Sequence, residues 1–151
     1  MEKEFITYEQ ALALKELGFD EPCFAYYSIN NIENKLFYDI DPDDGELTAL
    51  NQNQFYHNNL SEVGRISSPL KQQVFRWFRE KHGLSGIPDD ESYSIWKLIL
   101  GVRECIKEVY PLNNFEEAES DCINKLIEIV KNKTDEKDNT TDNNSNNRLH
   151  L

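Results

Sequence analysis

The side chains best able to do chemistry in this sequence are three cysteines and three histidines: Cys23, Cys105, Cys122, His57, His82 and His150. Zinc-binding or redox-active cysteines usually occur as CxxC pairs or with a histidine at a ligand spacing. Neither arrangement is present, and the number of cysteines is odd. We therefore predict buried free thiols, which are common in reducing compartments, and no metal site.

A second stretch with possible chemistry is "DIDPDDG", residues 39–45, whose carboxylates suggest calcium binding. An EF-hand loop requires glycine at position 6 and a bidentate glutamate at position 12. Counted from Asp39, position 6 is Asp44 and position 12 is Leu50, so neither requirement is met. The stretch instead predicts a turn in which Gly45 has a positive φ angle.

The short motifs that carry catalysis in many enzymes are absent from the sequence: a glycine-rich phosphate loop, HExxH and GxSxG. The adjacent acids Glu116 and Glu117 stand at the start of a predicted helix, where the helix dipole favours negative charge. They need no catalytic role. Since no nucleophile stands beside a base, we predict that the protein is not an enzyme and uses no cofactor.

Residues 67–84, "SSPLKQQVFRWFREKHGL", form the clearly basic stretch of the chain. Cations interleaved with aromatic residues are typical of nucleic-acid binding when both kinds of side chain share one surface. In a helix, however, residues at the spacing i, i+4, i+7 and i+8 share one face, which buries them. The residues at this spacing are Leu70, Val74, Trp77 and Phe78. The pattern therefore favours a core helix.

The charged residues of this helix point away from its apolar face. Arg76 and Arg79 lie on the outer side, and Glu80 follows Arg76 at the i+4 spacing of a helical ion pair. We take Arg76, Arg79 and Glu80 as candidates for contact with a partner, and an ordinary salt-bridged helix surface as the competing interpretation. Nucleic-acid binding through residues 67–84 remains the alternative function.

The composition indicates one globular domain of acidic character. The chain has 151 residues and a net charge of −12, and 38% of its residues are hydrophobic. This length suits a single domain with its own core. No run approaches the roughly 18 apolar residues of a membrane span, and the first residues lack the apolar segment of a signal peptide. We therefore expect a cytoplasmic protein that repels phosphate backbones and suits a basic partner.

The N-terminal half predicts one helix followed by strands. "ITYEQALALKELGF" contains a T-x-x-Q capping box formed by Thr7 and Gln10, and Gly18 fits the left-handed position that ends a helix. Strands are predicted at "PCFAYYSI" and "KLFYDI", with turn residues "NNIEN" between them. A short strand at "ELTAL" is compatible with the pattern, whereas residues 51–66 are a polar connection of no clear type.

The C-terminal half predicts two helices with a hairpin between them. The first helix has Ser68 as N-cap, Pro69 at its first position and Gly83 at its end. Residues 91–111 fit both a helix and a hairpin, and their β-rich composition with Gly101 at the centre favours the hairpin. "NNFEEAESDCINKLIEIVK" predicts the last helix, capped by Asn114 and Glu117. The polar, Asn-rich residues 132–151 predict a disordered tail.

Three segments carry a resemblance: "YEQALALKELGFDEPCFAYY", "SPLKQQVFRWFREKHGL" and "FEEAESDCINKLIEIVKNK". They resemble a set of small proteins of unknown function encoded by bacteriophages and mobile elements of gut bacteria. That set has a helix ending LGFDEPCF, a QxxFRWFREK helix and a closing YEEAExxCLxKLIEIVK helix. Residues 30–66 and 85–113 match poorly. The resemblance implies a phage or prophage origin and a place in the host cytoplasm, and it transfers no activity or site residue.

Together these patterns predict a single α+β domain over residues 1–131, with the order α-β-β-α-β-β-α. The strands are antiparallel, helices pack on one side of them, and the disordered tail over residues 132–151 follows. The expected function is that of a non-enzymatic, acidic protein-binding domain that engages or inhibits a basic host, phage or defence protein. No nucleic acid or membrane partner is expected.

Overall fold

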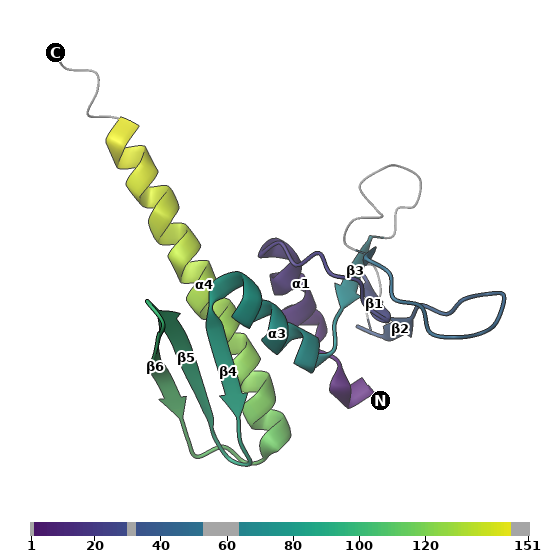
Figure 1. Cartoon of the computed structure of the whole chain (residues 1–151). Helices are drawn as coiled ribbons and strands as arrows, with labels where there is room; N and C mark the ends of the chain where they lie inside the picture. Colours follow the sequence, from purple (N-terminus) through teal and green to yellow (C-terminus); the bar gives the residue numbers. More distant parts are fainter. Residues whose placement is uncertain (1, 30–32, 53–63, 146–151) are drawn as a thin grey trace.

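The computed structural model describes residues 2–29, 33–52 and 64–145, and for residues 135–145 it describes the backbone alone (Figure 1). The first part of the chain forms η1 (Glu2–Glu4), α1 (Tyr8–Glu16), β1 (Ala25–Ser28), β2 (Leu36–Tyr38) and β3 (Arg65–Ser68). The second part forms α3 (Lys71–His82), β4 (Leu84–Pro88), β5 (Tyr93–Ile99), β6 (Val102–Val109) and α4 (Phe115–Ser145).

The strands form two antiparallel sheets of three strands each, in the orders β2-β1-β3 and β4-β5-β6. In Figure 1, α4 runs along the β4-β5-β6 sheet, and α3 lies between that sheet and α1. The predicted α+β class with antiparallel strands and helices packed against them is confirmed. Two strands were not predicted: β3 emerges from the polar connection, and β4 follows α3 directly.

The hairpin prediction for residues 91–111 is confirmed, since β5 and β6 pair along their length. Leu100 and Gly101 form the turn with φ angles of 49° and 82°. A two-residue turn with both φ angles positive matches the twist of the flanking strands. At the start of β5, Tyr93 and Ile95 are buried while their neighbours Ser94 and Trp96 are only partly buried, which is the alternation of a strand. Ile99 lies on the same face as Ile95 but is exposed near the hairpin turn.

The predicted capping of α1 is confirmed. The Thr7 hydroxyl accepts a hydrogen bond from the Gln10 backbone N–H at 3.3 Å, and the Gln10 side chain accepts one from the Thr7 backbone N–H at 3.1 Å. Gly18 follows the helix with a φ angle of 86°, in the left-handed region that glycine adopts without steric cost. The backbone of Phe19 then bonds back to Leu14 at 2.9 Å, which turns the chain toward β1.

The predicted start of α3 is wrong, whereas its predicted end is confirmed. Ser68 belongs to β3 and pairs with Ala25 of β1, so its backbone is held in the sheet and cannot cap a helix. The helix begins at Lys71, after Leu70, without a side-chain cap. Gly83 ends it with a φ angle of 65°, and the Gly83 N–H donates to the Phe78 carbonyl.

The buried apolar side chains of both sheets and of α1, α3 and α4 form one cluster. On α4, Val130 is the last buried residue among those whose side chains are described. The part of α4 that is buried against the core therefore ends close to residue 131, the predicted end of the domain. The α4 backbone continues to Ser145, so the helix ends later than predicted and enters the segment assigned to the tail. Residues 146–151 lie outside the described residues.

Two further predictions fall on poorly described segments. Residues 30–32 of the predicted "NNIEN" turn and residues 53–63 of the polar connection lie outside the described residues. The "ELTAL" segment contributes isolated bridges to Ile40 and Cys23. Within the described ranges, every helix is too short or too polar to cross a lipid bilayer.

Candidate functional site

The outer face of α3 carries the three residues predicted to contact a partner. Arg76, Arg79 and Glu80 are exposed, while Trp77 is 2% exposed and Phe78 is fully buried. The aromatic side chains pack into the core and the cations face water, as the helical spacing predicts. A base stacking on these aromatic rings would have to displace the core.

Arg76 pairs with a residue that the sequence analysis did not consider. Its guanidinium lies 2.7 Å from the Glu21 carboxylate, which precedes β1, whereas Glu80 at the i+4 position acts on Arg76 only through its charge. Gln73 donates to the same carboxylate oxygen at 3.0 Å and to the Pro22 carbonyl at 3.0 Å. Because two side chains of α3 converge on Glu21, its carboxylate is held within reach of Arg76. The ion pair is partly solvated and adds little stability.

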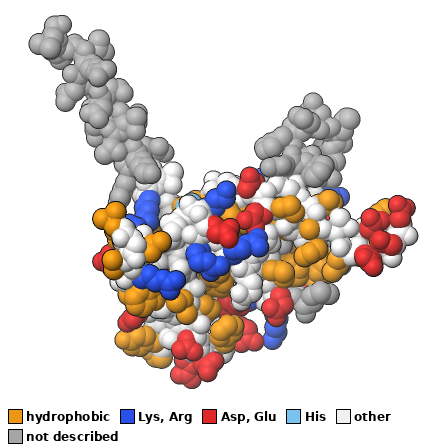
Figure 2. All heavy atoms as spheres, in the orientation of Figure 1, with side chains coloured by type: hydrophobic (Ala, Val, Ile, Leu, Met, Phe, Trp, Pro, Cys, Tyr) orange, Lys and Arg blue, Asp and Glu red, His pale blue; other side chains and the backbone are white. Residues whose placement is uncertain are grey.

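Arg79 and Glu80 make no hydrogen bond or ion pair with any side chain in the part of the chain that the structure describes. Figure 2 shows cationic side chains in a row over α3 with anionic side chains next to them. A helix surface of mixed sign suits contact with a protein better than contact with a phosphate backbone.

The most acidic exposed segment is the loop of residues 41–46, which projects from the end of β2 (Figures 1 and 2). The Asp41 carboxylate accepts a hydrogen bond from the Asp43 backbone at 2.8 Å, and the Asp44 carboxylate accepts one from Glu46 at 2.9 Å. Gly45 has a φ angle of 75°, which confirms the predicted turn. The loop therefore presents its acids on a backbone that is already folded.

Beside this loop, Asp39 is buried at 7% exposure. One carboxylate oxygen accepts a hydrogen bond from Gln52 at 2.7 Å, and the other is buried without a partner among the described residues. Burial raises the pKa of Asp39, while the Gln52 hydrogen bond and the charge of Arg65 act in the opposite direction. The group lies beneath the surface and is not available to a ligand.

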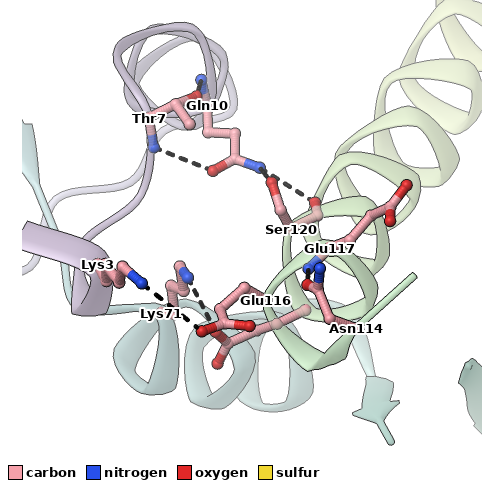
Figure 3. Close-up of polar contacts among 9 residues, drawn as sticks. Lys3, Thr7, Gln10, Lys71, Asn114, Glu116, Glu117 and Ser120 are labelled. Atoms are coloured by element: carbon pink, nitrogen blue, oxygen red, sulfur yellow. Dashed lines mark hydrogen bonds and ion pairs between the residues drawn. The ribbon is translucent and has the colours of Figure 1, made fainter. Parts of the chain in front are cut away.

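A pocket of about 560 Å³ lies between η1, α1, α3 and the start of α4. Figure 3 shows its polar side chains, which come from all four elements. The Lys71 ammonium lies 2.9 Å from the Glu119 carboxylate, and both side chains are about one-tenth exposed. At the rim, Lys3 is 3.9 Å from Glu116.

Polar side chains at and beside this pocket tie its helices together. The Gln10 amide nitrogen lies 2.9 Å from the Asn124 side-chain oxygen and 3.1 Å from the Ser120 carbonyl, which ties α1 to α4. Half of the predicted capping box of α4 is present: Asn114 accepts a hydrogen bond from the Glu117 N–H at 2.9 Å, but the Glu117 carboxylate accepts from the Asn113 N–H and not from that of Asn114. None of the lining residues has a buried polar side-chain atom without a partner. The pocket is thus the junction that holds the helices together.

The cysteines divide into two kinds. Cys23 and Cys122 are buried, and burial raises the pKa of each thiol to about 12, which keeps them protonated. Cys105 on β6 is partly exposed, so the prediction of burial is wrong for this residue. No group of three or more metal-binding side chains gathers in the described ranges, and two of the three histidines, His57 and His150, lie outside those ranges.

Sequence reasoning did not identify the exposed apolar residues around β6. Leu100 at the hairpin tip is fully exposed, Val102 is 68% exposed and Tyr110 is 70% exposed. A signal was present, because "LILGV" combines apolar residues with the glycine of a hairpin turn. Whether Leu100, Val102 and Tyr110 are exposed depends on which face of the hairpin packs against the helices, which the sequence pattern does not specify.

No protein family matches this chain, and neither the curated proteins nor the solved structures include one that is significantly similar to it.

Proposed function

We propose that this protein is a non-enzymatic accessory factor that binds a basic protein through its acidic surface. The resemblance to small phage and mobile-element proteins supports a role in the cytoplasm of a bacterial host. The basic partner is then a host, phage or defence protein. In one specific form the protein is an inhibitor that fills a basic groove of its target by presenting carboxylates.

The observation that carries this proposal is the folded acidic loop at residues 41–46. Asp43, Asp44 and Glu46 are exposed, and hydrogen bonds within the loop hold its backbone before any partner arrives. A loop that is already ordered loses less conformational entropy on binding. The net charge of −12 also draws a basic partner from a distance and repels nucleic acids.

Neutralising the loop tests the proposal. In affinity capture from infected host cells, the wild type should recover a basic protein, and Asp43→Asn/Glu46→Gln should lose it. These two side chains accept none of the hydrogen bonds that fold the loop. The matched control is Asp90→Asn/Glu91→Gln, which removes the same charges from the exposed turn between β4 and β5. Equal recovery by both variants would refute the role of the loop.

Nucleic-acid binding through α3 is the second candidate, since Arg79 and Lys81 are exposed on one helix. Two free cations are too few for tight non-specific binding, because affinity depends on the number of phosphates neutralised. We expect no binding to DNA or RNA tighter than about 100 μM at low salt. Micromolar binding that disappears in Arg76→Glu/Arg79→Glu would support this candidate over the first.

A further inference from the structure

Strand β6 lies at the edge of the second sheet, next to β5 alone (Figure 1). Its outer row of backbone N–H and C=O groups has no strand partner within the described residues. An unpaired edge of this length is a template for another strand, unless its charges or shape prevent pairing. The side chains of β6 therefore decide which strand, if any, can join it.

We propose that two copies of this chain associate through β6, joining their three-stranded sheets into one antiparallel six-stranded sheet. The sequence of β6, "VRECIKEV", has a charge pattern that is complementary to itself when reversed. A two-fold axis between residues 105 and 106 places Arg103 opposite Glu108 of the second copy. The same axis places Glu104 opposite Lys107 of the second copy. Opposite charges at facing positions stabilise strand pairing.

The β-bulge in β6 makes this register sterically possible. Residues that face each other across a two-fold axis must project from the same face of the sheet. Arg103 and Glu108 are an odd number of positions apart, so an uninterrupted strand would project them from opposite faces. In the structure they pair with Leu98 and Ser94 of β5, which are an even number apart and share one face. The bulge, with Ile106 as the extra residue, corrects the alternation.

The same correction applies to the other charged pair. Glu104 and Lys107 pair with Lys97 and Ile95 of β5, which also lie on a common face. Both charged pairs therefore satisfy the face requirement in a single register.

The neighbouring registers are disfavoured by both face and charge. Moving the two-fold axis by half a residue toward the N-terminus places Arg103 opposite Lys107, and moving it the other way places Glu104 opposite Glu108. The β5 partners of each pair are three positions apart, so the two side chains project from opposite faces of the sheet. Like charges directly opposite each other destabilise a strand pair. The register with opposite charges is therefore favoured over both of its neighbours.

The proposed register also covers the exposed apolar residues. It places Gly101 of one copy opposite Tyr110 of the second, so the fully exposed Leu100 side chain lies next to a tyrosine that is 70% exposed. Val102 faces Val109 of the second copy. Removing these side chains from water favours association at both ends of the strand. A contact of one strand pair is smaller than a standard stable interface, so we expect a dimer that depends on concentration.

Charge reversal tests the register. In sedimentation experiments, the wild type should approach twice the monomer mass as its concentration rises. Arg103→Glu should remain monomeric because it faces Glu108, and Arg103→Glu/Glu108→Arg should restore the dimer. Lys35→Glu makes the same charge change at an exposed site near the first sheet and should have no effect. A monomeric wild type, or a dimer that Arg103→Glu leaves intact, would overturn the proposal.

Cys105 offers a second readout, because it lies beside the two-fold axis and is partly exposed. A short bismaleimide reagent should link the Cys105 thiols of two copies at concentrations where the dimer forms. Cys105→Ser should abolish the linked species, since Cys23 and Cys122 are buried. Linking that persists equally in Arg103→Glu would show that the contact lies elsewhere.

Discussion

Gly86 on β4 is the position where the structure makes its sharpest stability prediction. A Cβ atom at this residue would lie 2.7 Å from the Cys122 sulfur, 2.9 Å from a Leu126 methyl group and 3.0 Å from the Phe75 ring. Ordinary carbon contacts lie at roughly 3.5–4.0 Å. Cys122 and Leu126 belong to α4 and Phe75 belongs to α3, so Gly86→Ala must displace buried side chains of both helices or the helices themselves.

Overpacking a close-packed site of this kind costs about 1–3 kcal/mol of unfolding free energy. In a domain of this size, that cost lowers the melting temperature by roughly 3–10 °C. Thermal and urea unfolding followed by circular dichroism measure the change. Ser85→Ala is the control, because it alters the neighbouring position on the same strand without adding volume.

A double-mutant cycle then identifies the cause. Cys122→Ala removes the atom nearest to the added methyl group, so Gly86→Ala should cost at least about 0.5 kcal/mol less in that background. Strict additivity of the two substitutions would refute the steric explanation. A cost for Gly86→Ala within about 0.5 kcal/mol would refute the close packing of β4 against the helices.

Three further predictions concern single side chains. Lys71→Met should cost about 3–5 kcal/mol in urea unfolding because it leaves the Glu119 carboxylate buried and unpaired, and Lys71→Met/Glu119→Gln should recover most of this. Because the pKa of Asp39 is raised by folding, its stabilising contribution is present at low pH and lost as pH rises through the ordinary carboxyl range and the raised pKa. Asp39→Asn should therefore gain stability relative to wild type as pH rises, and a constant difference across pH would contradict this. Trp77→Ala should cost about 2–5 kcal/mol and Arg79→Ala under about 0.5 kcal/mol, and the reverse order would mean that the two faces of α3 are misassigned.

The elements that could be predicted are those whose signals are local. The Thr7 and Gln10 capping box joins residues three positions apart, and Gly83 ends its helix through its own φ angle. The faces of α3 follow from helical spacing alone, which is why Trp77 was expected inside and Arg79 outside. Even the hairpin at residues 91–111 was recognisable, since Gly101 and the β-rich composition outweighed the helical spacing of its apolar residues.

The misassigned residues depend on contacts that are distant in the chain. Ser68 has the chemistry of a helix cap but pairs with Ala25 in β3, and Arg76 has Glu80 at the right helical spacing but pairs with Glu21. Cys105 was expected to be buried like other free thiols, yet the helices do not cover β6. Local spacing predicts a contact or a degree of burial for each of these residues. The packing of elements that are distant in the chain gives each of them a different contact or exposure.

By itself, then, the sequence determined the capped helices, the hairpin, the acidic character and the α+β class, because each of these depends on residues close together in the chain. The tertiary structure alone decided that β3 and β4 exist, that Gly86 packs against α3 and α4, and that β6 remains at an open edge. These features depend on which faces of the sheets the helices bury, and that is decided only when the helices and sheets pack together.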